Sequence, residues 1–174
     1  MKHTNIFAAI AATLGSVVAL GAAGPARAHE GDTAATGPAT PPPAAAILQL
    51  EAVRQAAARY LDVDHAIADG YVDIGVFFPN MGWHYLKGDL LDDRFEATAP
   101  ELLVYADDPC GGKRRLVAVE YAVPLDLSKR APSGFAGSAD TWSVNSAFGL
   151  WTLHAWVYEY NPDGVFAPNN PRVQ

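Results

Sequence analysis

Two short apolar segments joined by a polar turn set the architecture of this chain. Residues 101–106 and 114–123 have the length and the β-branched and aromatic content of strands. The residues between them, Asp-Asp-Pro-Cys-Gly-Gly-Lys at 107–113, are dense in turn formers. The pattern predicts a β-hairpin, and therefore a sheet that is at least partly antiparallel.

Further segments of strand type extend this prediction. Residues 71–78 are mostly of strand type and end at Pro79, residues 83–86 form a short extended segment, and residues 150–160 form the last expected strand. A long polar stretch, residues 125–145, is expected to be a loop, and loops of this length are functional or mobile. The strands therefore account for most of the second half of the chain.

The segment before these strands is helical in pattern. Apolar residues recur at helical spacing between residues 47 and 61, and charged residues fall largely on the other side. Asp62 or Asp64 can cap a second short helix, and Gly70 is a good residue to end it. We expect helices over 47–69, broken near Asp62. The predicted fold is α+β, a single domain at 47–174 with N-terminal helices packed on an antiparallel sheet.

The first 28 residues resemble a secretory signal peptide. Lys2 precedes an apolar run from Ile6 to Leu20, which is the length of a signal-peptide core and short for a membrane span. Ala26-Arg27-Ala28 matches the small-x-small cleavage pattern. We predict cleavage near Ala28, an exported protein that is periplasmic or secreted, and no integral membrane segment after cleavage.

Cleavage there makes His29 the new N-terminus. A terminal amine beside an imidazole can chelate copper(II), but residues 29–46 have the low-complexity Ala/Thr/Pro composition of a disordered linker. A flexible tail is the favoured interpretation of this segment. Participation of His29 in a site stays open.

Charge and cysteine content exclude several classes of protein. The formal net charge is −7, with no basic run, so nucleic acid is not an expected partner. The single cysteine, Cys110, excludes an intramolecular disulfide and any zinc or iron–sulfur site that needs several cysteines. The role of Cys110 and the oligomeric state stay open.

Three ionisable residues interrupt the apolar strands: His84, Glu120 and His154. Burying such groups is costly unless they are paired or used. Strand alternation places Glu120 on one face with Leu116, Ala118 and Ala122, and the other face of that strand has the apolar character of a core. By the same rule His154 shares a face with Thr152, Trp156, Tyr158 and Tyr160. Adjoining strands would place Glu120 and His154 about 5 Å apart at the backbone, and His84 can reach the same face.

Two histidines and a carboxylate have two chemical uses. They can bind a divalent transition metal, copper or zinc rather than calcium or magnesium, because imidazole is a borderline ligand. They can also act without metal as acid and base in a hydrolase or lyase. A purely structural role, with each histidine hydrogen-bonded locally and Glu120 paired with an arginine, is the third interpretation.

Aromatic and basic residues near these positions are candidates for contacting a small molecule. They are Trp83, Tyr85, Trp156, Tyr158 and Arg114. The aromatic rings can stack on a ligand, and the guanidinium can hold an anion. If these residues only bind a ligand, the chain is a binding module that carries out no reaction. The sequence leaves enzyme and binding protein as open alternatives.

Several motifs together resemble a known family. In order they are Ala-Asp-Gly-Tyr-Val (68–72), Asn-Met-Gly-Trp-His-Tyr (80–85), Leu-Val-Ala-Val-Glu-Tyr (116–121) and Leu-Trp-Thr-Leu-His-Ala-Trp (150–156). The set is similar to a family of exported bacterial proteins of unknown function that carry Gly-aromatic-His-Tyr and His-x-Trp elements. The resemblance covers most of residues 60–174. It implies export and a single domain, and it implies no particular chemistry.

Overall fold

The helices follow the apolar spacing of the sequence. The computed structural model describes residues 41–174, in which α2 spans Ala44–Ala57, the 3₁₀ helix η1 spans Ala58–Leu61 and α3 spans Val63–Ala68. Along α2 the buried residues recur every three or four positions: Ala46, Leu50, Val53 and Ala57. The helix begins before the boundary predicted at residue 47, and Ala46 is fully buried. The folded domain therefore includes the last residues of the segment interpreted as a linker.

The predicted break at Asp62 is present. Asp62 has extended backbone angles, and its carboxylate accepts a hydrogen bond of 3.1 Å from the backbone N–H of Asp64. This bond satisfies one of the free N–H groups at the start of α3. Gly70 ends the helical region with φ of 96°, a conformation that is strained for residues with a Cβ.

The strands form one sheet. Over residues 41–174 it has six antiparallel strands in the order β1-β2-β3-β4-β6-β5. Their bounds are Val72–Phe78 (β1), Gly82–Leu86 (β2), Leu102–Ala106 (β3), Arg115–Pro124 (β4), Ser143–Asn145 (β5) and Leu150–Ala155 (β6), and a short 3₁₀ helix, η2, spans Gly88–Leu90. The predicted hairpin is the β3–β4 pair.

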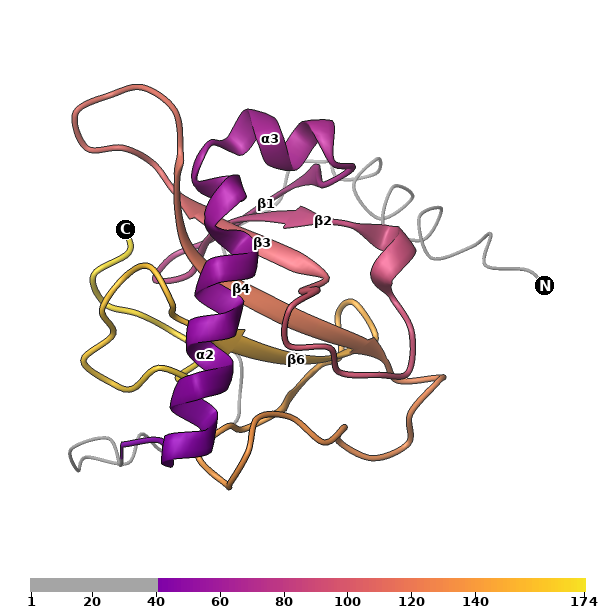
Figure 1. Cartoon of the computed structure of the whole chain (residues 1–174). Helices are drawn as coiled ribbons and strands as arrows, with labels where there is room; N and C mark the ends of the chain where they lie inside the picture. Colours follow the sequence, from indigo (N-terminus) through magenta and orange to yellow (C-terminus); the bar gives the residue numbers. More distant parts are fainter. Residues whose placement is uncertain (1–40) are drawn as a thin grey trace, which may run out of the picture. The chain divides into compact units, whose positions relative to one another are not determined.

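The two faces of the sheet have different coverings. Figure 1 shows α2 lying across the face of β3, β4 and β6, where its apolar side packs on Leu103, Tyr105, Tyr121 and Leu153. We call this the helix face. The opposite face has its own smaller apolar cluster, made of Val104, Ala106, Val117, Ala118, Trp156 and Val173. The described residues are one α+β domain, as the sequence predicts.

A β-bulge in β4 changes the expected side-chain alternation. Val104 pairs with Ala118 but Tyr105 pairs with Leu116, so Val117 is an extra residue on β4. Leu116 consequently packs on the helix face and Val117 on the opposite face. The prediction that Leu116 shares a face with Glu120 is therefore wrong, because strict alternation does not survive an inserted residue.

The last strand is shorter than predicted. β6 ends at Ala155, after which the backbone N–H of Trp156 donates to Val165 O rather than to a sheet neighbour. Tyr158 then packs on the helix-face cluster, and its hydroxyl donates to Arg54 O. The expectation that Tyr158 and Tyr160 share a face with His154 is wrong, because regular strand pairing ends at Ala155. The N–H groups of Tyr158 and Glu159 both donate to Val117 O at the bulge of β4, and Tyr160 is 71% exposed. The loop predicted at 125–145 contains the short strand β5.

The predicted signal peptide and the first part of the predicted linker lie outside the described residues. Within residues 41–174, none of the helices combines the length and the hydropathy that crossing a membrane requires.

Candidate metal centre

The three ionisable residues come from three strands. His84 is on β2, Glu120 on β4 and His154 on β6, and Glu120 and His154 are direct cross-strand partners. His84 is opposite Val104, which in turn is opposite Ala118. Cross-strand partners point to the same side of a sheet, so these pairings place all three residues on the face opposite α2.

Curvature of the sheet brings His84 into contact range. β2 and β6 are separated by β3 and β4, and three strand spacings amount to about 14 Å in a flat sheet. The ring centroids of His84 and His154 are only 6.2 Å apart. The sheet is a curled half-barrel, and the histidines meet across its inner face. Sequence separation alone could not reveal this convergence.

Gly82 lets β2 approach β3 closely beside His84. It has φ of 118°, and a Cβ built at this position would lie 2.4 Å from Tyr105 O. Any other residue here would push the two strands apart or change the turn that begins β2. The glycine therefore helps to fix the position of the His84 backbone.

The donor atoms converge without hydrogen-bonding to one another. Nε2 of His84 is 3.5 Å from one carboxylate oxygen of Glu120, and Nε2 of His154 is 3.7 Å from the other. One donor atom from each residue lies within 4.8 Å of the other two. Both Nε2–oxygen distances exceed the 2.7–3.2 Å of an ordinary N–H···O hydrogen bond. Among the described residues, His154 Nε2 and His84 Nδ1 are buried without a hydrogen-bond partner.

Burial controls the protonation of all three groups. Each residue is about 5% exposed or less. Desolvation raises the pKa of Glu120 to about 8 and lowers the pKa of His84 to about 4. Burial and the neighbouring His84 lower the pKa of His154 to about 3. At neutral pH the cluster therefore holds two neutral imidazoles and, without a cation, a protonated carboxyl group.

Aromatic rings hold the two imidazoles in place. The Phe78 ring meets the His84 ring edge-on at 5.7 Å, and Trp156 stacks on His154 at 6.0 Å with an interplanar angle of 12°. Trp156 is anchored in turn, because its indole N–H donates to Ala167 O at 2.6 Å. Of the residues predicted to contact a ligand, Trp156 is the one that lies beside the cluster.

Three other predicted ligand-contact residues lie elsewhere. Trp83 and Tyr85 flank His84 in β2 and so point to the other face, where the Arg114 guanidinium lies 3.8 Å from the Trp83 ring centroid. Arg114 also donates to the Tyr85 hydroxyl and to the Asp73 carboxylate, at 2.8 and 2.6 Å. Trp83, Tyr85 and Arg114 thus form a separate group with its own ion pair.

A buried carboxyl group that sequence reasoning missed lies nearby. Glu101 is 2% exposed, burial raises its pKa to about 8, and its carboxyl accepts a hydrogen bond from Ala122 N at 3.0 Å. β3 begins at Leu102, which pairs with Glu120, so Ala122 in β4 has no partner on β3. The Glu101 carboxyl accepts the hydrogen bond that a strand residue would otherwise accept. The available signal was a glutamate directly before an apolar strand.

The comparisons give no relative from which to transfer a function. No model of a known family, no curated protein and no solved structure matches this chain. The resemblance to a family of exported bacterial proteins therefore stays a prediction, and the geometry of the His84, Glu120 and His154 cluster carries the functional argument.

Proposed function

We propose that this protein binds one zinc or copper ion through His84, Glu120 and His154. The observation that carries the proposal is the spacing of the donor atoms. The two Nε2–oxygen distances are 3.5 and 3.7 Å. Two ligands bonded to one first-row ion at about 2.1 Å in tetrahedral geometry are about 3.4 Å apart. Each histidine is already at about that distance from one of the two Glu120 oxygens, and the longest separation within the set, up to 4.8 Å, would have to shorten when an ion binds.

The absence of hydrogen bonds inside the cluster supports the same proposal. A structural triad would be expected to close into bonds of about 2.9 Å, because an unpaired buried polar atom costs about 1–3 kcal/mol. His154 Nε2 is buried, unpartnered within the described residues, and only 3.7 Å from a Glu120 oxygen. A shared cation would satisfy the histidine nitrogen and the carboxylate together.

The donor set favours zinc or copper over calcium or magnesium. Two imidazole nitrogens and one carboxylate suit borderline ions, whereas hard cations take oxygen ligands. Three protein ligands leave a coordination position for water or a small molecule, and a zinc or copper ion bound there would act as a Lewis acid. We therefore propose metal binding, or metal-assisted chemistry on a small molecule, as the role of this face of the sheet.

The metal-free acid–base alternative is supported by Glu120, whose pKa of about 8 suits an acid or base near neutral pH, but not by the two histidines. A general base works best with a pKa near the operating pH, and burial lowers the pKa values of His84 and His154 to about 4 and 3. Imidazoles with such values are weak bases at neutral pH. They are, however, already deprotonated, which is the state that a metal ligand requires.

Export is a second part of the proposal. It rests on the apolar run and the Ala26-Arg27-Ala28 pattern of the sequence. The mature protein would then meet its metal outside the cytoplasm. No residue of the proposed metal centre is in the segment that cleavage would remove.

Metal analysis of the full chain tests the site. After dialysis against zinc and then metal-free buffer, mass spectrometry should find close to one ion per chain in the wild type. The variants His84→Ala and His154→Ala should each retain much less. His65→Ala is the matched control, because His65 is an exposed histidine outside the cluster. Equal zinc in all four proteins, or none in the wild type with either zinc or copper, would refute the proposal.

A further inference from the structure

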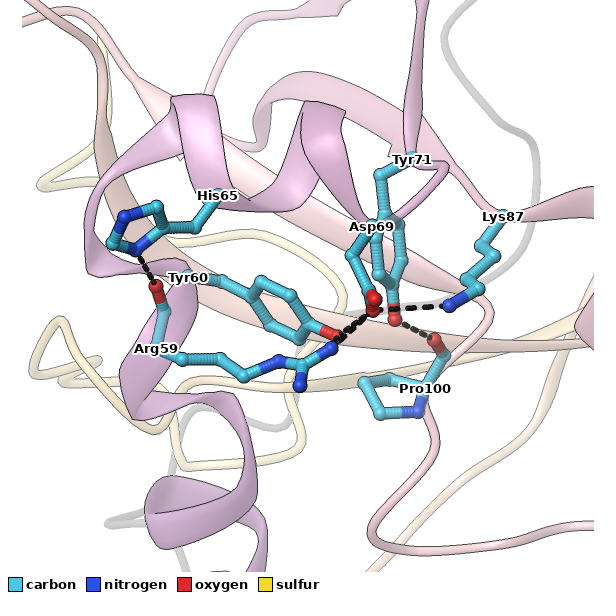
Figure 2. Close-up of polar contacts among 7 residues, drawn as sticks. All are labelled: Arg59, Tyr60, His65, Asp69, Tyr71, Lys87 and Pro100. Atoms are coloured by element: carbon cyan, nitrogen blue, oxygen red, sulfur yellow. Dashed lines mark hydrogen bonds and ion pairs between the residues drawn. The ribbon is translucent and has the colours of Figure 1, made fainter.

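A second group of charged side chains lies on the helix side of the sheet. The Asp69 carboxylate accepts hydrogen bonds from the Tyr60 hydroxyl at 2.5 Å, from Lys87 Nζ at 3.0 Å and from Arg59. Figure 2 shows Arg59 and Tyr60 reaching Asp69 from one side and Lys87 reaching it from the other. These contacts link η1, the end of α3 and the residue after β2.

The group borders a pocket of about 290 Å³. That volume is at the lower end of the range for small-molecule sites, so an occupant must be small. The pocket has two kinds of wall. The polar residues are Arg59, Tyr60, Asp69, Lys87 and Thr98, and the apolar surface comes from Ala56, Leu90, Ala99 and the Tyr71 ring.

The polar wall carries an excess of positive charge. Arg59 and Lys87 are cations, and Asp69 supplies one negative charge between them. All the hydrogen bonds to Asp69 reach a single carboxylate oxygen, and they hold the pKa of this group well below its usual range. The pocket wall is therefore a net cation of one charge in a chain whose net charge is −7.

Donors are left over on both cations. A guanidinium has five N–H groups, and toward the described residues Arg59 donates only through Nη2. An ammonium group has three N–H donors, and in the same part of the chain Lys87 uses one for Asp69 while lying 5.5 Å from the Tyr71 ring centroid. The pocket thus combines spare charged donors with a short apolar surface.

We propose that this pocket binds a small organic acid, with its carboxylate held by Arg59 and Lys87 and its short apolar body against Ala56, Leu90 and Ala99. Carboxylates match charged N–H donors in strength and geometry. The apolar wall gives a short-chain carboxylate an advantage over inorganic phosphate, which has no apolar part to bury. The site is independent of the proposed metal centre, which lies on the opposite face of the sheet.

Titration of the full chain with three probes tests the proposal. The probes are butyrate, its neutral analogue butyramide and inorganic phosphate, each added in the presence of EDTA and followed by amide chemical shifts in NMR. We expect saturable binding of butyrate, with shifts centred on Arg59, Asp69 and Lys87. Butyramide and phosphate should bind at least tenfold more weakly. Absence of saturable butyrate binding, or equal binding of phosphate, would overturn the proposal.

Two variants with opposite expected effects localise the site. Lys87→Met keeps the length of the side chain but removes the charge, so it should weaken butyrate binding at least tenfold. Asp69→Asn removes the competing carboxylate and should tighten binding several-fold. Arg94→Gln is the control for net charge, because Arg94 is highly exposed and does not line the pocket. Equal weakening by Arg94→Gln, or no change in either Lys87→Met or Asp69→Asn, would show that the acid binds elsewhere or by nonspecific charge attraction.

Discussion

Replacing Glu120 with glutamine should remove part of the alkaline instability of the metal-free protein. Burial raises the pKa of Glu120 from 4.5 to about 8 in the folded state. Between these values the unfolded chain has released the proton and the folded chain still holds it. The free energy of unfolding therefore falls as pH rises, by about 1.4 kcal/mol per pH unit for this one group.

Other buried groups also change the free energy of unfolding with pH, and they determine the pH range in which the contribution of Glu120 can be measured. Glu101 has the same raised pKa of about 8 and contributes a slope of the same sign. The pKa values of His84 and His154 are lowered from 6.5 to about 4 and 3, so these residues destabilise the fold as pH falls below 6.5. Among the described groups, the two glutamates dominate above pH 6.5, and His84 and His154 oppose them slightly because their unfolded-state imidazoles are still half protonated at pH 6.5. From pH 6.5 to pH 8 the two glutamates together should cost about 3 kcal/mol, since each is half ionised in the folded state at pH 8, and the two histidines should return less than about 1 kcal/mol.

Urea unfolding at pH 6.5 and pH 8 in the presence of EDTA measures this loss. The wild type should lose about 2–3 kcal/mol between the two pH values. Glu120→Gln should lose only about 1 kcal/mol, as should Glu101→Gln, the matched variant outside the metal cluster. If Glu120→Gln has the same pH dependence as the wild type, the carboxyl is not held protonated by burial and the reasoning fails. Saturating zinc should abolish the contribution of Glu120, because the bound ion keeps the carboxylate ionised.

Two further predictions concern the metal and the N-terminus. Copper(II) bound at His154 should quench the fluorescence of Trp156, which stacks on that imidazole at 6.0 Å, whereas zinc, with its closed d shell, should not. Trp156→Phe should remove most of the quenching, and quenching that survives His154→Ala would place the copper elsewhere. Protein recovered from the periplasm or medium should begin at His29 when sequenced from its N-terminus, and intact chain found only in the cytosol would contradict export.

The predicted strand faces depend on a period of two residues, and the errors come either from not applying that period or from a bulge that interrupts it. A period of two is a local property, so the sequence could indicate that Glu120 and His154 face the same way if their strands pair. The pairing is direct in the structure. The same period could also have separated Trp83 and Tyr85 from His84, since neighbours in a strand point to opposite faces. The bulge at Val117 arises from the fit between β3 and β4, which no local pattern in β4 reports.

The charged group around Asp69 could not be predicted from the sequence. Arg59 lies in η1, Asp69 directly after α3 and Lys87 directly after β2. In the sequence each looks like an ordinary surface charge. Nothing in their spacing distinguishes them from other surface residues of this acidic chain. Their convergence depends on how η1, α3 and the end of β2 pack together.

The sequence by itself determined the α+β class, the β3–β4 hairpin, the helix break at Asp62 and the choice of His84, Glu120 and His154 as candidates. These follow from periodicity, turn chemistry and the cost of burying charge, which act over a few residues at a time. Only the tertiary structure decided that the sheet curls enough to bring His84 to within 6.2 Å of His154 across two intervening strands. Twist and packing against α2 accumulate over the whole sheet, so the distance between two of its strands is not encoded in either of them.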